Sequence, residues 1–230
     1  MKKVFFAILA AGMLSSFGGA AYADDQSDIS VGGRITPASC DIDIAGGGTF
    51  DYGNLTPADL NPTSQKVMSR LTKAVTVQCG SPTTIALSLT DHRANSRAGT
   101  YIAVPMIGGS EDIYNGNRYG LGFDGAGKGI GGYAAFLGTA SADGKTVVGL
   151  ISRNGGTSWA AETRGWFGAS DNGDAGSLRA WKATTAASNA PMAITNLTVD
   201  LNVAAIVQGT QGLTNDFDFD GQSTLSLSYL

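Results

Sequence analysis

The stretch STLSLSYL, residues 223–230, has the pattern of a β-strand with one buried face. Its apolar side chains, Leu225, Leu227 and Tyr229, fall in period two, and the residues between them are Thr224, Ser226 and Ser228. No turn, polar tail or charged residue follows in the sequence. We therefore expect a sheet edge at residues 225–230 that has no neighbouring strand from its own chain.

The first residues have the three parts of a secretory signal peptide. Lys2 and Lys3 supply a positive start, residues 4–14 form an apolar run, and Ala21-Tyr22-Ala23 is a small-x-small cleavage site. The apolar run is too short to span a membrane. An N-terminal core helix, the alternative, does not explain the order of these signals, so we predict that residues 1–23 are removed after Ala23.

The mature chain, residues 24–230, is acidic. Removal of Lys2 and Lys3 lowers the number of basic residues from 15 to 13, against 19 acidic ones, so the net charge falls from −4 to −6. An acidic exported chain is a poor binder of nucleic acid. No other apolar stretch approaches membrane-spanning length, and we expect a soluble exported protein of one large domain or two small ones.

Two cysteines, Cys40 and Cys79, stand 39 positions apart. In an oxidising compartment an even number of cysteines favours a disulfide. Closing a loop of this length would stabilise the fold by roughly 4 kcal/mol in the chain-entropy model. Free buried thiols remain the alternative.

Short alternating runs between turn residues predict an all-β fold. The clearest are KAVTVQC (73–79), TTIALSLT (83–90) and NLTVDLNVAA (196–205). Turn signals include Ser81-Pro82 and Asp143-Gly144, and the second of these predicts a hairpin. Residues 57–71 fit a helix, or equally a loop with one helical turn. Many short antiparallel strands favour a β-sandwich or barrel.

The middle of the chain, about residues 107–185, is rich in glycine and contains all three tryptophans, Trp159, Trp166 and Trp181. No Pro- or Ser-rich linker flanks it, and no repeat of fixed period occurs. We therefore interpret it as hairpins and long loops inserted into the sandwich, not as a separate domain.

Two short motifs match ligand-binding loops only in part. DFDFDG, residues 216–221, fits the first half of a calcium loop, but Leu227 stands where a bidentate Glu is required. GKGIGG, residues 127–132, fits G-x-G-x-x-G, but no helix follows, and Lys128 precedes Gly129 instead of Ser or Thr. We predict an acidic turn and a glycine-rich turn, respectively.

The sequence offers little for catalysis. His92 is the only histidine, and no G-x-S-x-G motif is present to supply a nucleophile. A zinc site lacks ligands, and Glu111 and Glu162 are the only glutamates. We predict a protein that is not an enzyme and that uses no cofactor or metal.

A second alternating segment precedes the first cysteine, in ISVGGRITPASC, residues 29–40. Its apolar row consists of Ile29, Val31, Gly33 and Ile35. A glycine inside such a row leaves a gap where a side chain would be, which often marks the close approach of another chain segment.

Taken in order, these segments resemble the subunits of chaperone–usher pili, or fimbriae. Such subunits have an alternating N-terminal extension with a glycine, a cysteine soon after it, a second cysteine ending the second strand, and a final alternating strand with Tyr next to last. The matching segments are residues 29–35, Cys40, Val75–Cys79 and Leu225–Leu230, and FDYGNL (50–55) stands at the family's aromatic-Gly turn. The chain closely resembles the sub-group of fimbrial-type two-cysteine proteins that are described only as containing a domain of unknown function.

The resemblance implies an incomplete immunoglobulin-like β-sandwich over residues 35–230, with a Cys40–Cys79 disulfide and an enlarged Gly-rich middle. Residues 24–34 would be an extension whose strand, with Ile29, Val31, Gly33 and Ile35, completes a neighbouring subunit. The groove that receives such a strand would be bordered by Leu225, Leu227, Tyr229 and Leu230.

The implied partners are a periplasmic chaperone, an outer-membrane usher and neighbouring subunits, and the implied destination is a cell-surface fimbria. We expect a structural subunit. The alternative is a minor or tip subunit that binds host carbohydrate, with the three tryptophans and Tyr114, Tyr119 and Tyr133 as a sugar-stacking surface; these aromatics would equally fill a core. An exported hydrolase using His92 is a third interpretation.

Overall fold

The computed structural model describes Gly32 and residues 39–56, 59–99, 102–106, 109–113, 118–168, 176–209 and 218–230, with only the backbone for 102–106 and 109–113. The chain divides after Thr36 into two units, Met1–Thr36 and Pro37–Leu230. The predicted signal peptide and the segment with Ile29, Val31, Gly33 and Ile35 lie outside the described residues, as do Tyr114 and Asp216.

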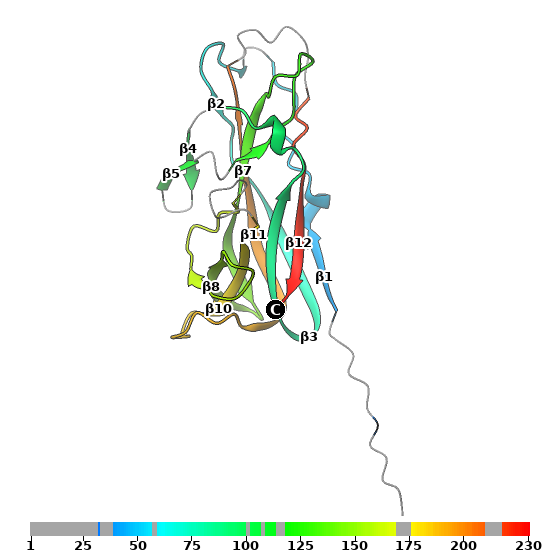
Figure 1. Cartoon of the computed structure of the whole chain (residues 1–230), viewed down its shortest axis with the longest axis vertical. Helices are drawn as coiled ribbons and strands as arrows, with labels where there is room; N and C mark the ends of the chain where they lie inside the picture. The colour runs from blue at the N-terminus through cyan, green and yellow to red at the C-terminus, as the bar shows by residue number, and fades with distance from the viewer. Residues whose placement is uncertain are drawn as a thin grey trace, which may run out of the picture. The chain divides into compact units, whose positions relative to one another are not determined.

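The described residues form strands joined by turns and short 3-10 helices (Figure 1). The strands are β1 (Cys40–Ile44), β2 (Lys66–Val67), β3 (Leu71–Asp91), β4 (Ile102–Met106), β5 (Gly109–Ile113), β6 (Tyr119–Gly120), β7 (Gly131–Ala142), β8 (Lys145–Ser152), β9 (Ala160–Ala161), β10 (Leu178–Ala183), β11 (Ala193–Val207) and β12 (Ser223–Tyr229), and the 3-10 helices include η1 (Ala45–Gly48) and η3 (Ala94–Ser96). For residues 57–71 the sequence left open a helix or a loop with one helical turn. The described part is mainly a loop, with Asp59 in a 3-10 turn, and contains the short strand β2.

The all-β prediction is confirmed, and the sheet closes into a barrel. β3 pairs with β10, β10 with β8, β8 with β7, β7 with β11, and β11 again with β3, and every pairing is antiparallel. β1 and β12 each pair with β3 and lie outside this ring. The Gly-rich middle, interpreted from the sequence as hairpins and long loops inserted into a sandwich, therefore supplies three of the ring's strands, β7, β8 and β10.

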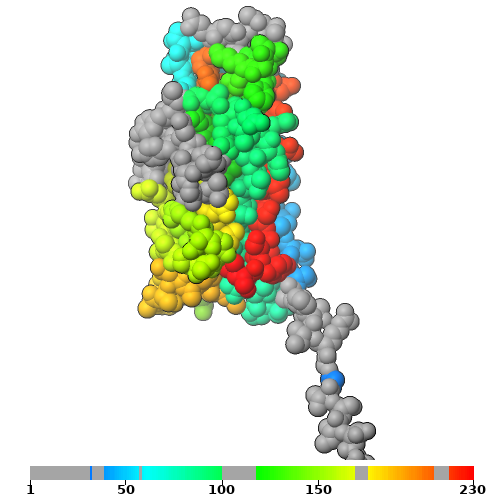
Figure 2. Space-filling model, viewed as in Figure 1, coloured from blue at the N-terminus to red at the C-terminus, as the bar shows by residue number. Residues whose placement is uncertain are grey.

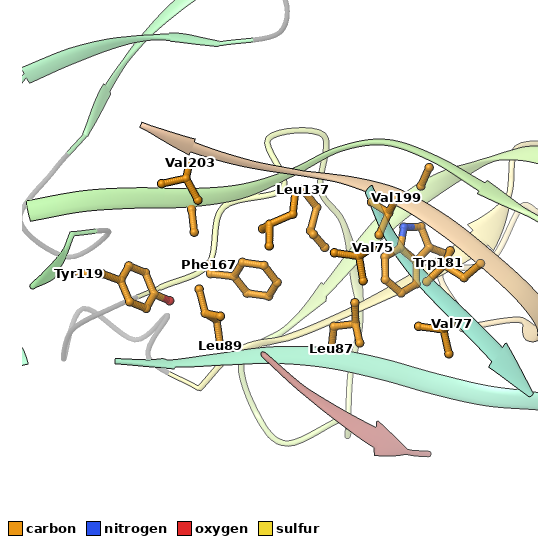
Figure 3. Close-up of a cluster of buried hydrophobic side chains, with 14 of the residues drawn as sticks. Val75, Val77, Leu87, Leu89, Tyr119, Leu137, Phe167, Trp181, Val199 and Val203 are labelled. Atoms are coloured by element: carbon orange, nitrogen blue, oxygen red, sulfur yellow. The ribbon is translucent and has the colours of Figure 1, made fainter. Parts of the chain in front are cut away.

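β3 contains two of the predicted alternating runs in one strand. Its pairing with β11 is interrupted between Gln78 and Thr83, where the predicted turn Ser81-Pro82 lies, and resumes at Thr83. Proline has no N–H to donate, so it fits the interruption. The strand bends there, and its two halves face each other across the core, with Val75 and Val77 on one side and Leu87 and Leu89 on the other (Figure 3).

The hairpin predicted at Asp143-Gly144 is confirmed between β7 and β8. Both residues have positive φ, +49° and +75°, as a tight two-residue turn requires. The Asp143 carboxylate also accepts hydrogen bonds from the main-chain N–H groups of Thr195 and Asn196, where β11 has an irregularity opposite the bend of β3. One turn residue thus satisfies donors that the interrupted ladder leaves open.

The main core lies inside the ring and contains several large aromatic side chains. Tyr119, Tyr133, Phe167 and Trp181 are buried there. Trp166 belongs to a second buried cluster, where it packs on Phe136 at a centroid distance of 5.0 Å. The sugar-stacking surface considered for these aromatics is therefore wrong for Trp166, Trp181, Tyr119 and Tyr133, because hydrophobic packing removes them from solvent. Trp159 is half-buried, with its indole N–H bonded to the Gly156 carbonyl.

Cys40 and Cys79 form the predicted disulfide, with a Cα–Cα distance of 3.9 Å. The two residues are directly opposite each other on β1 and β3. Since β1 pairs with β3 alone among the described residues, the bridge secures the start of a strand that has a single hydrogen-bonded neighbour.

We expect the exported protein, denatured without reductant, to contain no titratable thiol. Replacing Cys40 and Cys79 together with alanine should lower the free energy of unfolding by roughly 4 kcal/mol, because the denatured chain regains the freedom of the open loop. Thiol titration and urea unfolding measure the two effects. Two free thiols, or an unchanged urea midpoint, would contradict the role assigned to the bridge.

Candidate functional site

The candidate site is the gap between the edge strands β1 and β12. Both strands pair with β3, and no second partner strand is present for either within the described part of the chain. Figure 2 shows the surface of β12, in red, next to that of β1, in blue. The Cys40 N–H donates to the Tyr229 hydroxyl at 2.9 Å, so the start of β1 lies beside the end of β12. The two strands are therefore antiparallel neighbours.

The open edge of β12 can be assigned residue by residue. The Leu230 N–H donates to Thr84, and the His92 N–H donates to the Gln222 carbonyl, so the even-numbered residues bond to β3. In an antiparallel strand the alternate residues direct their main-chain groups to the opposite side. The N–H and C=O groups that face the gap therefore belong to Ser223, Leu225, Leu227 and Tyr229.

The edge of β1 follows the same logic. The Gly80 N–H donates to the Ser39 carbonyl at 3.0 Å, which makes the next pair, Cys40 with Cys79, one of the non-hydrogen-bonded pairs. Its short Cα–Cα distance agrees with that assignment. The main-chain groups of Cys40, Ile42 and Ile44 therefore point away from β3, toward the gap.

The same residues also turn apolar side chains to the core without being fully covered. Ile42, Ile44, Leu225 and Leu227 pack against the core cluster, but all four are only partly buried. By contrast, Val75 on β3 is completely buried. Two rows of aliphatic side chains thus border a groove that exposes the interior of the fold.

The groove widens into a cavity of about 480 Å³ between η1 and the start of β12. Its apolar walls come from both edges and from the core behind them: Ile44, Phe50, Leu89, Leu121, Leu201 and Leu225. Tyr52, Tyr133 and Phe219 also line it, and the Tyr52 and Phe219 rings meet edge to face at 6.3 Å. Such walls suit aliphatic side chains.

The polar atoms of this lining already have partners in the chain. The Tyr52 hydroxyl donates to the Val203 carbonyl at 3.3 Å and accepts from the Ala205 N–H at 3.0 Å, and the Tyr133 hydroxyl bonds to the Ser223 hydroxyl. Burial raises the pKa of Tyr52 and of Tyr133 to about 12. Both phenols are therefore neutral at physiological pH, and their rings present an apolar surface.

The groove brings together only part of what the sequence indicated. Leu225, Leu227 and Tyr229 lie on β12, and Leu230 follows beyond it with its N–H bonded to Thr84; that this edge receives another strand stays a prediction. The contribution of β1 was not foreseen, although the alternation Cys40, Ile42, Ile44 was visible beside the predicted donor segment. Tyr52 lies in the aromatic-Gly turn that the sequence marked, but its reach to β11 depends on the tertiary fold.

The partial ligand motifs form ordinary turns in their described parts. Phe219 packs inward, Asp220 pairs with Arg93 at 2.5 Å, and Asp218 is exposed. In the glycine motif, Asp124 accepts N–H bonds from residues 126 and 128 in a turn that leads into β7. Among the described residues, no group of three or more His, Cys, Asp or Glu side chains could hold a metal ion.

His92 is exposed, and its imidazole lies 2.6 Å from the Thr224 hydroxyl. A hydrolytic triad requires a serine on one side of the imidazole and a carboxylate on the other, and Thr224 is neither. The described hydrogen bonds of His92 thus place it at the outer face of β12. In the part of the chain that the structure describes, no helix has both the length and the apolar character to cross a membrane.

Replacing Tyr52 with phenylalanine should lower the free energy of unfolding by about 1–3 kcal/mol, because the buried Ala205 N–H loses its acceptor. The same change at Tyr229, whose hydroxyl bond is exposed, should cost less. Guanidinium unfolding of the two variants measures the difference. Equal losses would mean that the Tyr52 hydroxyl does not support the cavity wall.

Comparison with known proteins gives two matches. Residues 29–134 match the family model described as "Protein of unknown function (DUF1120)". This match includes the alternating segment and both cysteines. The chain is also 30% identical to "Protein GltF" of Escherichia coli (strain K12) over 254 aligned positions, which cover 97% of this chain and 96% of GltF. Because the similarity extends over nearly the full length of both proteins, the chain belongs to the same family as GltF.

Proposed function

We propose that this protein is a structural subunit of a chaperone–usher pilus and that it polymerises by donor-strand exchange. The observation that carries the proposal is the groove between β1 and β12, where two unpaired strand edges border an apolar cavity. In this proposal the domain, residues 35–230, is an immunoglobulin-like sandwich that lacks one strand, and residues 24–34 are the extension that completes a neighbour.

The groove has the physical requirements of a strand-binding site. Its main-chain groups on β1 and β12 would bond to a strand laid between them, and its apolar row would accept every second side chain. An open edge of this kind is also an aggregation hazard, since it pairs with any available strand. A periplasmic chaperone that fills the groove until the next subunit arrives would remove that hazard.

The proposed occupant is the segment from Ile29 to Ile35 of a neighbouring copy. It has seven residues with apolar side chains in period two, and β12 also has seven residues, Ser223–Tyr229. Gly32 is the one described residue of this segment. It is exposed, and a Cβ added to it would have no other atom within 4 Å. Length and alternation thus agree between the segment and the edge.

A neighbour's segment fits better than the chain's own. The chain enters β1 at Cys40, so its own segment would have to reverse within residues 36–39 and then run antiparallel to β1. It would thereby run parallel to β12, because β1 and β12 are antiparallel. A segment from another copy has no such restriction and can pair antiparallel with β12, which is the more stable arrangement per residue.

Donation from each copy to the next is a head-to-tail contact that does not close on itself, so it builds a filament. The proposed route is export through the periplasm, capture by the chaperone, and assembly at an outer-membrane usher into cell-surface fimbriae. The role is structural and not catalytic. The carbohydrate-binding alternative loses its main support, because four of the aromatics considered for it are buried.

The proposal predicts that a synthetic peptide of residues 24–37 binds the exported full-length chain. Gly33→Leu in the peptide should weaken binding by about 5- to 150-fold, because overpacking a fitted site typically costs about 1–3 kcal/mol. Gly32→Leu is the matched control: its side chain would point out of the groove, and its effect should be small. Fluorescence anisotropy of labelled peptides measures the affinities.

Absence of binding by the unchanged peptide, in the chain with or without its chaperone, would refute donor-strand pairing. Equal affinities of the two leucine peptides would refute the assignment of Gly33 to the inner face.

A second prediction concerns the edge itself. Leu227→Asp should abolish peptide binding and reduce the yield of exported protein, because the carboxylate would lie in the apolar groove. Ser226→Asp, one residue away on the outer face, should leave both nearly unchanged. Peptide anisotropy and immunoblots of periplasmic extracts provide the readouts. If the two variants behaved alike, β12 would not be the groove edge.

A further inference from the structure

The groove is closed at one end by the Tyr229 side chain. Its hydroxyl bonds to the Cys40 N–H, and Cys40 is held in turn by the disulfide to Cys79. The phenol thus extends from β12 to β1 across the groove, where an inserted strand would otherwise continue. It is 55% exposed, so it lies at the surface instead of filling the core.

We propose that Tyr229 determines the register of the inserted strand, with Ile29 beside Leu227, Val31 beside Leu225 and Gly33 beside Ser223. This inference rests on the proposed function and deepens it. Tyr229 is a positioning residue here, because it excludes the incoming strand from the last place on the edge.

Only a few registers are compatible with the groove. The main-chain groups that face it belong to odd-numbered residues of β12, and the apolar side chains of the segment are also at odd numbers. A shift by one residue would turn the apolar row to solvent, so the allowed registers differ by two. The nearest alternative places Ile29 beside Tyr229 and Gly33 beside Leu225.

The proposed register, with Gly33 beside Ser223, explains why the segment has a glycine. The Tyr133 and Ser223 hydroxyls bond to each other, which brings the Tyr133 ring to the level of Ser223 in the groove. A residue without a side chain fits beside Ser223. In the alternative register Ile35 would meet this obstruction, and Gly33 would leave the wider cavity beside Leu225 unfilled.

The main chain of β1 gives a second, independent reason. The Cys40 N–H is already used by Tyr229, and the groups of Ile42 and Ile44 remain for an incoming strand. A strand that extended to Tyr229 would have to break the Tyr229–Cys40 bond. A strand that stops at Leu227 leaves it intact.

Cross-linking with cysteines on the outer face distinguishes the registers. In an antiparallel pairing with Ile29 beside Leu227, Ser30 is opposite Ser226 in a non-hydrogen-bonded pair, where Cα atoms are close enough for a disulfide. In the alternative register Ser30 is opposite Ser228. The reagents are the 24–37 peptide carrying Ser30→Cys and full-length chains carrying Ser226→Cys or Ser228→Cys, and the adduct is quantified by mass spectrometry.

We expect about tenfold more adduct with Ser226→Cys, because a cysteine two positions away lies beyond disulfide reach. Adding Tyr229→Ala should open the end of the groove that Tyr229 closes. The yield of adduct should then rise for the Ser228→Cys chain and fall for the Ser226→Cys chain. Tyr229→Phe tests whether the hydroxyl bond is required in addition to the ring.

Preference for Ser228→Cys in the chain with Tyr229, or no adduct with either cysteine while the peptide still binds, would overturn the register. An unchanged preference after Tyr229→Ala would overturn the role of Tyr229. Loss of peptide binding altogether, measured by anisotropy in the same chains, would count against the proposed function itself.

Discussion

The groove depends on the edges of β1 and β12 that face away from β3, where no further strand is paired within the described residues. The five strands of the ring have neighbours on both sides, but β1 and β12 are bonded to β3 alone within the described residues. Unpaired N–H and C=O groups beside exposed aliphatic side chains are costly, and they pair with the next strand that becomes available. The proposed need for a chaperone and the proposed use of the groove in assembly both rest on that single deficit.

The bend in β3 is what places these two edges together. Its first half carries β1 and its second half carries β12, so a strand that folds over itself brings both unpaired edges to the same side. The bend is supported by the Asp143 carboxylate, which satisfies N–H groups of β11 where the ladder is interrupted. The disulfide and the Tyr229 hydroxyl then close one end of the groove, and the opposite end widens into the cavity. The bend in β3 and the Asp143 turn that supports it thus determine the shape of the groove, although neither belongs to β1 or β12.

Several strands, one hairpin and the disulfide could be predicted from the sequence, because each depends mainly on local sequence patterns. Alternation predicted β3, β11 and β12, Asp143-Gly144 predicted a hairpin, and two cysteines in an exported chain predicted a bridge. What could not be foreseen depends on distant contacts. Tyr52 reaches β11 across 151 residues, and the Gly-rich middle contributes three strands to the ring. Aromatic residues gave the least reliable signal, since the pattern of Trp166 and Trp181 does not distinguish a surface from a core.

The most direct test of the central claim is residue-resolved amide hydrogen exchange along β12. In the free chain the amides of Leu225 and Leu227 should exchange rapidly, and those of Ser226 and Ser228, which bond to β3, should be protected. Addition of the 24–37 segment should protect the odd-numbered amides and leave the even-numbered ones unchanged. Equal protection of all β12 amides in the free chain, or odd-numbered amides that stay exposed with the segment bound, would contradict the account.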